Sequence, residues 1–234
     1  FPKVITDSRN VYKDSLFFAL KGENFNGNEY ANDAIKKGCK YAIIDEVKYN
    51  LNENYILVDN VLETLQQLAV YHRETLNIPI IGITGSNGKT TSKELITACL
   101  STELNTAYTK GNYNNHIGVP LTLLEINYDH EIAIIEMGTN HQGEIQFLSE
   151  IAKPNFGVIT NIGKAHLEGF KDFEGVKKTK KELYDYIKKV NGLVFINSDD
   201  DILNEISKDL DLVKYGKSGD YFGSLFDTSV FCEV

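Results

Sequence analysis

The chain has 234 residues, of which 42% are hydrophobic and 11% aromatic, and its formal net charge is −9. This composition excludes a disordered chain and allows one large folded domain or two ordinary ones. Basic residues are interspersed with acidic ones, whereas a dedicated nucleic-acid binder usually shows a basic face, so we expect no nucleic-acid partner.

Neither a membrane helix nor a signal peptide is predicted, because no apolar run approaches about twenty residues. The cysteines are Cys39, Cys99 and Cys232; they lie far apart and form no CxxC pair. Free thiols are typical of a reducing compartment, so we expect a cytoplasmic protein without membrane insertion.

The first 77 residues predict short strands and two helices. Strands are expected at Leu16–Leu20, Tyr41–Glu46 and Tyr55–Asp59, with a helix between the first two that stops at Gly38. A helix over Val61–Leu76 follows from apolar residues at helical spacing. It ends before Asn77-Ile78-Pro79, because proline disfavours helix in the residue before it. We therefore place a domain boundary here, giving domains 1–77 and 78–234.

After this boundary the pattern predicts a mostly parallel α/β sheet. The continuous apolar run Ile80–Thr84 is typical of a strand buried on both faces, and a helix is predicted over Lys89–Leu100. Further strands are expected at Glu131–Gly138, Phe156–Gly163 and Gly192–Asp201, and further helices at Gly143–Lys153 and Phe173–Lys189. The fold class is therefore α/β: a small N-terminal α/β domain followed by a mostly parallel-sheet phosphate-loop domain. Four good strands are fewer than a doubly wound domain needs, so we expect the second domain to be incomplete.

The stretch GITGSNGKTT, which starts at Gly82, predicts a phosphate-binding loop. Five residues separate Gly82 from Gly88, one more than in the usual loop. A strand, a glycine-rich turn and a helix start bring backbone N–H groups and the positive helix terminus to an anion. Lys89 can reach the outer phosphates, and the Thr90 hydroxyl can bind Mg²⁺. The predicted nucleotide-binding residues are Gly85, Ser86, Asn87, Gly88, Lys89, Thr90 and Thr91. The alternative is a glycine-rich turn without a ligand.

The sequence TGSNGKTT resembles the ATP loop of the Mur ligases, which join amino acids to the peptidoglycan precursor and share this longer spacing. GNYNNHIGVPLTLL (111–124), IIEMGTNHQGEI (134–145) and TNIGKAHLEGF (160–170) resemble the branch that adds D-alanyl-D-alanine to UDP-N-acetylmuramoyl-tripeptide. Residues 6–38 resemble the first domain of that branch. The resemblance implies an ATP-dependent ligase that needs Mg²⁺, takes these two substrates and works through an acyl phosphate.

The resemblance also assigns metal and catalytic roles, beginning with Lys89 in the loop. Glu136 ends an apolar strand, where a carboxylate can hold Mg²⁺, and the family pattern makes it a metal ligand. His166 corresponds to a ligand of a second Mg²⁺; the alternative is a surface histidine, because Mg²⁺ prefers oxygen. Lys180 corresponds to a lysine that CO₂ carbamylates into a metal ligand, followed two residues later by Glu182. Neighbouring lysines leave the register open, and the alternative is a solvated helix face.

Substrate-binding residues are expected in two places. Ser8, Arg9, Lys21 and Gly22 correspond to the part of the family that receives the uridine-diphosphate end, and an arginine suits a diphosphate. The alternative is a structural salt bridge beside a glycine turn. Asn112, Asn114 and Asn115 can donate to a phosphate or a peptide carboxylate. The alternative there is a turn held by asparagine side chains. We interpret His72-Arg73-Glu74 as solvated.

Other functions remain open. The third domain of the family has no counterpart here, so we expect the chain alone to be inactive in ligation, and we expect a monomer. A nucleotide-dependent ATPase or switch would use the same loop, but its second motif would end in Asp, where this chain has Glu136. Another Mur-type ligase, the related folylpolyglutamate enzyme and a non-catalytic binding module are the remaining alternatives.

Overall fold

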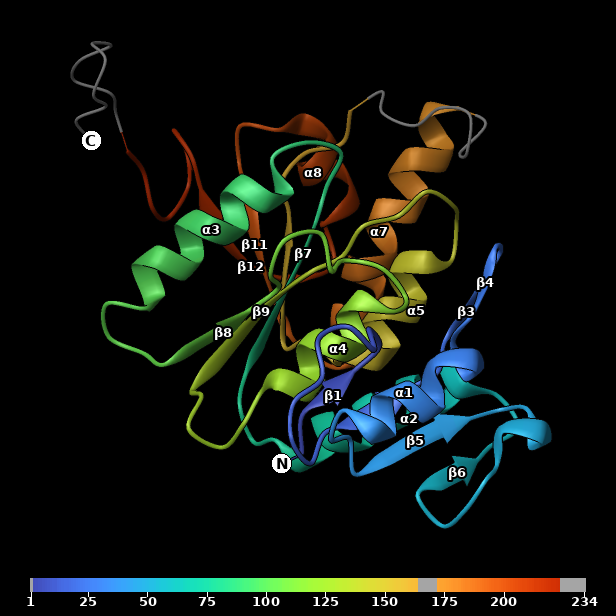
Figure 1. Cartoon of the computed structure of the whole chain (residues 1–234). Helices are drawn as coiled ribbons and strands as arrows, with labels where there is room; N and C mark the ends of the chain where they lie inside the picture. The colour runs from blue at the N-terminus through green and yellow to red at the C-terminus, as the bar shows by residue number, and fades with distance from the viewer. Residues whose placement is uncertain (1, 164–171, 224–234) are drawn as a thin grey trace, which may run out of the picture. The chain divides into compact units, whose positions relative to one another are not determined.

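The computed structural model describes residues 2–163 and 172–223 and divides the chain into two compact units (Figure 1). The first unit consists of Phe1–Asn77 and Lys110–Asp129, and the second of Ile78–Thr109 and His130–Val234. The first break therefore falls in the predicted linker. Sequence order alone, in contrast, assigns residues 110–129 to the second domain.

The first unit is built on a four-stranded parallel sheet in the order β1-β2-β5-β6. These strands are β1 (Val4–Ile5), β2 (Leu16–Phe18), β5 (Tyr41–Ile44) and β6 (Tyr55–Leu57). A small antiparallel hairpin of β3 (Lys21–Gly22) and β4 (Phe25–Asn26) follows β2. The helical elements are η1 (Gly27–Tyr30), α1 (Ala31–Lys36), η2 (Val47–Tyr49), α2 (Val61–Thr75) and α4 (Gly118–Glu125).

The core of this unit lies on both faces of its sheet, because successive strand residues point to opposite sides. Phe17 packs in a buried cluster with Ala31 and Ala34 of α1. Phe18 packs in a second cluster with Leu65 of α2, which partly buried residues of α4 also join. Helix α1 therefore covers one face, and α2 and α4 cover the other. This packing explains why residues 110–129 belong to the first unit.

Two residues of α2 expected to be solvated are in fact buried. His72 is 6% exposed and Arg73 is 7% exposed. The His72 Nε2 atom lies 2.7 Å from the carbonyl oxygen of Ile126, just after α4, and Arg73 donates to the Leu76 carbonyl at 3.0 Å. The interpretation of His72 and Arg73 as solvated was wrong, whereas Glu74 is exposed, as expected. His72 finds its partner far along the chain, just after α4, and Arg73 finds its partner at the end of its own helix.

The second unit contains a six-stranded, fully parallel sheet in the order β12-β11-β10-β7-β9-β8. Its strands are β7 (Ile80–Thr84), β8 (Thr106–Tyr108), β9 (Ile132–Glu136), β10 (Phe156–Ile159), β11 (Leu193–Asn197) and β12 (Asp211–Tyr215). Its helices include α3 (Lys89–Leu100), α5 (Glu144–Ala152), α7 (Phe173–Lys189) and α8 (Asp201–Ile206). The predicted bounds of β7, α3 and α7 are confirmed.

Four strands were predicted for this sheet, and β8 and β12 were missed. Strand β8 has only three residues, and the sequence of β12 begins with Asp211 and includes Lys214, at partly or fully exposed positions. Both strands lie at the edges of the sheet, where burial imposes little apolar pattern. The sheet therefore has the strand number of a doubly wound domain.

The order of the strands creates a switch point beside β7. From β7 the chain passes to β8 and β9 on one side, and it then crosses to β10, β11 and β12 on the other. Helix α3 packs on one face through Ile96 and Leu100, and α5 and α7 contact the opposite face (Figure 1). In open parallel sheets, ligands bind outside the carboxyl ends of the strands at such a point, here between β7 and β10.

Within the described residues, no helix is long and apolar enough to cross a membrane. Cys39 and Cys99 are free thiols, as predicted, and Cys232 lies outside the described residues.

Candidate nucleotide site

The loop between β7 and α3 needs glycine at two positions for different reasons. Gly85 has a φ of +151°, and a Cβ atom added to it would lie 1.9 Å from the Thr160 hydroxyl oxygen. Gly88 has a φ of +74° and is the N-cap of α3, and a Cβ atom added to it would meet no other atom within 4 Å. The first glycine permits a close approach, and the second permits a left-handed turn into the helix.

The segment after β10 fixes this loop. The Asn161 carbonyl accepts from the Ser86 N–H at 3.0 Å, and its side-chain oxygen accepts from the Asn87 N–H at 3.0 Å. The Thr160 hydroxyl donates to the Asn87 carbonyl at 2.6 Å. The Ser86 and Asn87 amides are thus engaged by protein. The first N–H groups of a helix have no intrahelical acceptor, so the amides at the start of α3 are the ones oriented to bind an anion.

Lys89 folds over this loop. Its Nζ donates to the Gly85 carbonyl at 2.8 Å and to the Ser86 carbonyl at 3.3 Å. Burial lowers the pKa of the Lys89 ammonium, and the negative charge of Glu136 opposes that shift. The ammonium therefore lies within electrostatic reach of the carboxylate that ends β9.

Glu136 and Thr90 are the residues at which the sequence predicts oxygen ligands for Mg²⁺. Glu136 is the last residue of β9 and is 1% exposed, and Thr90 lies in the exposed first turn of α3. Among the described residues, no group of three His, Cys, Asp or Glu side chains could hold a metal ion. One carboxylate, one hydroxyl and nucleotide phosphates suit Mg²⁺, which keeps several waters and few protein ligands. The predicted ligand His166 lies outside the described residues.

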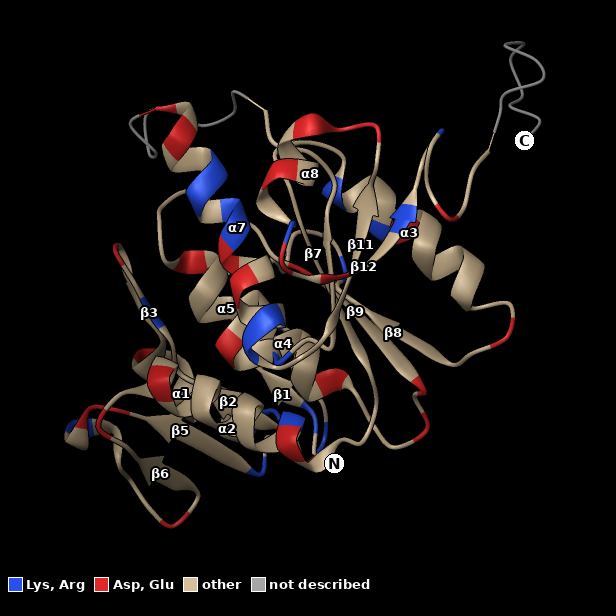
Figure 2. Ribbon diagram, turned by 180° about the vertical axis from the view of Figure 1, so that it is seen from behind, with Lys and Arg blue, Asp and Glu red and all other residues tan. Residues whose placement is uncertain are grey.

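Lys180 is the buried lysine of the cluster on α7, whose basic residues Figure 2 shows in blue. It is 3% exposed, whereas Lys178 is exposed. Lys177 pairs with Glu205 at 3.1 Å, and Lys181 pairs with Asp185. The solvated-face alternative therefore does not apply to Lys180, and burial distinguishes it from its neighbours.

The surroundings of Lys180 favour its neutral form. Burial lowers its pKa to about 8, and the positive charge of Lys89 adds to this effect. The carboxylates of Glu182 and Glu144 oppose the shift. A neutral amine is the form that reacts with an electrophile such as CO₂.

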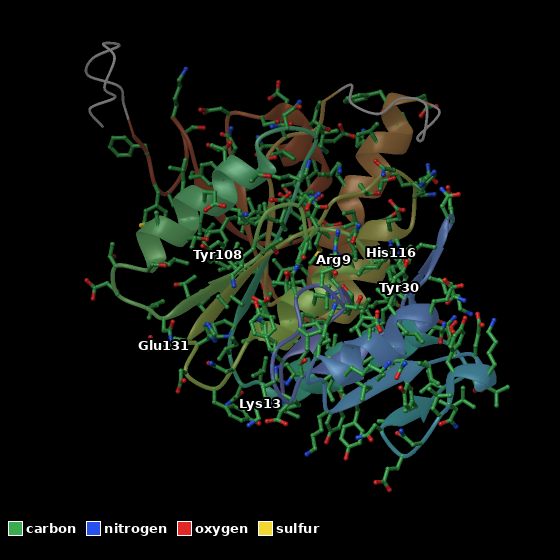
Figure 3. All side chains as sticks on the ribbon, in the orientation of Figure 1. Arg9, Lys13, Tyr30, Tyr108, His116 and Glu131 are labelled. Carbon is green, nitrogen blue, oxygen red and sulfur yellow. The ribbon has the colours of Figure 1, made fainter. Side chains whose placement is uncertain are left out.

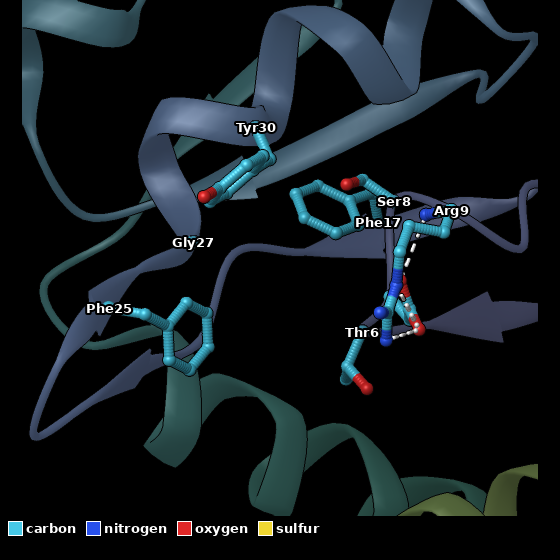
Figure 4. Close-up of a pocket in the computed structure, with 8 residues that line it drawn as sticks. Thr6, Ser8, Arg9, Phe17, Phe25, Gly27 and Tyr30 are labelled. Carbon is cyan, nitrogen blue, oxygen red and sulfur yellow. Dashed lines mark hydrogen bonds and ion pairs between the residues drawn. The ribbon is translucent and has the colours of Figure 1, made fainter.

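A separate pocket of about 430 Å³ lies in the first unit (Figure 4). Its lining includes the rings of Phe17, Phe25 and Tyr30 and the polar side chains of Thr6, Asp7, Ser8 and Arg9. Arg9 and Tyr30 are also labelled in Figure 3. The pocket combines aromatic rings with hydroxyl and guanidinium groups, a composition suited to a flat polar ring and an anion.

The arginine of this pocket already has a carboxylate partner. Arg9 Nη2 lies 2.8 Å from Asp7 Oδ2, and Arg9 Nε donates to both oxygens of the same carboxylate. The predicted residues Lys21 and Gly22 form β3, and neither is among the described residues that line the pocket. Lys21 instead pairs with Asp45 at 2.9 Å. Arg9 and Lys21 therefore both form ion pairs within the protein, which is what the salt-bridge alternative describes.

Asn112, Asn114 and Asn115 belong to the first unit, whereas the phosphate loop belongs to the second. The Asn115 side-chain oxygen accepts from the N–H groups of Ile117 and Gly118 at 3.1 and 2.9 Å. Asn115 thus holds the turn into α4, as the alternative reading proposed. Asn112 is exposed, and Asn114 is partly buried.

A parallel sheet with a glycine-rich loop, a lysine and a threonine at its switch point defines a phosphate-loop nucleotide-binding domain. The chain belongs to the Mur ligase family. Residues 83–229 match the family described as "Mur ligase middle domain", and residues 3–73 match "Mur ligase family, catalytic domain".

Named relatives extend this result. A protein of Bacillus subtilis named UDP-N-acetylmuramoyl-tripeptide--D-alanyl-D-alanine ligase is 40% identical over 220 residues, which cover 93% of this chain and 48% of the relative. MurF from Acinetobacter baumannii superposes with a TM-score of 0.84 at 36% identity, covering 94% of this chain and 49% of that one. MurF ligase from Thermotoga maritima in complex with ADP superposes with a TM-score of 0.86 at 30% identity, covering 97% of this chain and 54% of that one. The chain spans about half the length of the curated relatives it matches.

Proposed function

We propose that this chain provides the nucleotide-binding and UDP-substrate-binding parts of a cytoplasmic ligase that adds D-alanyl-D-alanine to UDP-N-acetylmuramoyl-tripeptide with ATP. The observation that carries the proposal is the phosphate loop at the switch point, with Lys89, Glu136 and Lys180 around it. The family and the names of its relatives support the choice of reaction.

In this proposal the triphosphate lies over the start of α3. The N–H groups of Gly88, Lys89, Thr90 and Thr91 donate to phosphate oxygens, and the Lys89 ammonium leaves the loop carbonyls to bind the outer phosphates. The Thr90 hydroxyl and the Glu136 carboxylate would hold Mg²⁺, which would supply positive charge to the transferring phosphoryl group. His166 is proposed as a further ligand, as its sequence context implies.

Lys180 is proposed to be carbamylated. Its neutral amine nitrogen bonds to the carbon of CO₂ and loses a proton, which gives an anionic carbamate. The lowered pKa of Lys180, about 8, makes a larger neutral fraction of this amine available near neutral pH than an ordinary lysine has. Lys89 provides the positive charge beside which the new anion is favoured. The carbamate oxygens would be of the kind that Mg²⁺ prefers as ligands.

The aromatic pocket of the first unit is proposed to receive the uridine diphosphate. Phe25 and Tyr30 offer faces on which the uracil ring can stack, and the Ser8 hydroxyl can hydrogen-bond to the nucleotide. Arg9 would exchange its carboxylate partner, Asp7, for the diphosphate. Lys21, Gly22 and the asparagines at 112, 114 and 115 are proposed to contact more distant parts of the substrate.

The reaction proceeds in two steps in this proposal. A carboxylate oxygen of the tripeptide attacks the γ-phosphorus of ATP, and ADP leaves, which gives an acyl phosphate. The amine of D-alanyl-D-alanine then attacks the acyl carbon, loses a proton, and phosphate leaves as the peptide bond forms. Lys89 stabilises charge on the transferring group, and anchoring the uridine end holds the reacting carboxylate in place.

An ADP-release assay with each substrate omitted in turn tests this proposal. It is run on this chain and on a full-length protein that contains it. For the full-length protein we expect multiple-turnover ADP release to require both the UDP-tripeptide and D-alanyl-D-alanine, because the acyl phosphate of the first step is consumed only when the dipeptide attacks it. ADP release with neither acceptor would instead support the ATPase or switch, and release with a single amino acid in place of the dipeptide would support another ligase of the family.

A further inference from the structure

Lys93 is a buried cation that the phosphate loop does not use. It lies on α3 one turn after Lys89, on the same face of the helix, and it is 0% exposed. A lysine is almost never fully buried without partners, because taking its charge out of water is costly. The contacts of the Lys93 ammonium therefore indicate the role of this buried charge.

The ammonium of Lys93 is directed at the carboxyl end of β8. Its Nζ donates to the Thr109 carbonyl at 2.6 Å and lies 2.9 Å from a carboxylate oxygen of Glu94. It also lies 5.7 Å from the centre of the ring of Tyr108, the last residue of β8, which is labelled in Figure 3. Glu94 is about half exposed, so the contact that lies wholly in the interior is the one to Thr109.

Thr109 connects this cation to Glu136. Thr109 is 0% exposed, and its hydroxyl oxygen accepts from the Glu136 N–H at 2.9 Å. Its own N–H donates to the Ile134 carbonyl at 3.0 Å. On the opposite side, the N–H of Met137 donates to the Ile83 carbonyl of β7 at 2.8 Å. The backbone that carries the Glu136 carboxylate is therefore fixed on one side by β7 and on the other by Thr109.

We propose that Lys93 is a positioning residue for the metal site: through the carbonyl and hydroxyl of Thr109 it fixes the backbone of Glu136 relative to α3. Because α3 carries Lys89 and Thr90, the same helix then sets the position of both the phosphate-binding groups and the carboxylate. The inference rests on the proposed function, since it assigns Lys93 to the nucleotide-bound Mg²⁺.

The test measures binding of ADP to the full chain at a series of Mg²⁺ concentrations, and in EDTA. Partners of metal ligands typically change metal affinity by about 10–100-fold when they are removed. We expect Lys93→Met and Thr109→Val each to change the Mg²⁺ dependence of ADP binding. The Mg²⁺ concentration at which the enhancement of ADP binding is half-maximal should rise by about 10-fold or more. ADP binding in EDTA should not change, because the amides of α3 remain in place.

Matched variants separate positioning from simple stability. Thr109→Ser keeps the hydroxyl and should respond to Mg²⁺ like the wild type. Lys177→Met removes a partly buried lysine with acidic partners, far from Thr109 in sequence, and should also leave the response unchanged. Lys93→Met combined with Glu136→Gln should weaken the Mg²⁺ response of ADP binding no more than Glu136→Gln alone. The reason is that the effects of substitutions within one network do not add.

The outcomes are distinct. If Lys93→Met does not fold, the Thr109→Val and Thr109→Ser pair decides the question. Folded Lys93→Met and Thr109→Val proteins with the Mg²⁺ requirement of the wild type would overturn the inference and leave the proposed function intact. A wild-type chain whose ADP binding ignores Mg²⁺ would contradict the inference together with the proposed metal site.

Discussion

Glu182 of α7 caps a helix to which it does not belong: its carboxylate accepts from the N–H of Gly143, the N-cap of α5, at 2.7 Å. The other oxygen accepts from the N–H of Gln146 at 3.0 Å. Gly143 has no side chain with which to cap α5, so the capping group comes from α7, two residues after Lys180. The glutamate two residues after Lys180 thus joins α7 to the start of α5.

Replacing Glu182 should therefore destabilise the second unit. We expect Glu182→Ala to lower the free energy of unfolding by about 1 kcal/mol, because two N–H groups and the positive end of α5 lose their acceptor. Urea unfolding followed by circular dichroism measures the change. Lys178→Ala, at an exposed position of the same helix, is the control. Equal stability of the two variants would show that the cap contributes nothing.

The two loop glycines should differ in their tolerance of alanine. Gly88→Ala should cost about 1–2 kcal/mol, because the added methyl meets no atom and only the left-handed φ is strained. Gly85→Ala should cost more, since its methyl would also overlap the Thr160 hydroxyl. We compare the free energy of unfolding of these two variants with that of a double variant, Gly85→Ala combined with Thr160→Ala. The double variant should recover part of the loss, and equal costs at Gly85 and Gly88 would contradict the close approach.

Asp45 should make the first unit sensitive to acid. Burial alone would raise the pKa of its carboxyl, but hydrogen bonds from Lys21 and Asn28 outweigh burial and hold the pKa below its ordinary value of 3.8. A carboxyl with a depressed folded-state pKa stabilises the fold above its unfolded pKa, and this contribution is lost as the pH falls through the folded-state value. The stability difference between wild type and Asp45→Asn should therefore be constant above about pH 5 and should shrink below pH 4. Thermal unfolding from pH 7 to pH 2.5 tests this, and a difference that grows on acidification would contradict it.

We predict that Lys180 lowers the stability of the folded chain, although the proposed ligation requires it. Its lowered pKa means that the folded state disfavours the ammonium, so the charge is a cost at neutral pH that is relieved as the pH rises above about 8. We expect Lys180→Met to unfold at the same temperature as the wild type or a higher one at pH 7, and to lose ligation in the full-length protein. A ¹³C NMR signal from a carbamate in ¹³C-bicarbonate should be present in the wild type and absent from the variant. A variant that retains ligation would contradict the proposed role.

Local sequence patterns predicted most of the second unit. The apolar run of β7 and the helical periodicity of α3 and α7 are properties of short segments, so their bounds followed from the sequence. The phosphate loop is also local, since its glycines, Lys89 and Thr90 are contiguous. Burial of Lys180 within a lysine-rich helix depends on α7 packing against the sheet, which the sequence shows only through the apolar residues around it.

Contacts between distant segments could not be predicted in this way. The packing of α4 on α2, which buries His72 and places residues 110–129 in the first unit, depends on segments about fifty residues apart. Asn161 completes the loop from the end of another strand. The Lys93–Thr109 hydrogen bond was missed as well, because a lysine in an amphipathic helix is usually solvated and its partner is a backbone carbonyl.

A crystal structure of the chain with Mg²⁺ and a non-hydrolysable ATP analogue tests the central claim most directly. The account predicts phosphate oxygens on the N–H groups of Gly88–Thr91, with Lys89 turned away from the Gly85 carbonyl. It also predicts Mg²⁺ between the phosphates and the carboxylate of Glu136. A nucleotide bound elsewhere, or a metal ion that Glu136 does not contact, would contradict it.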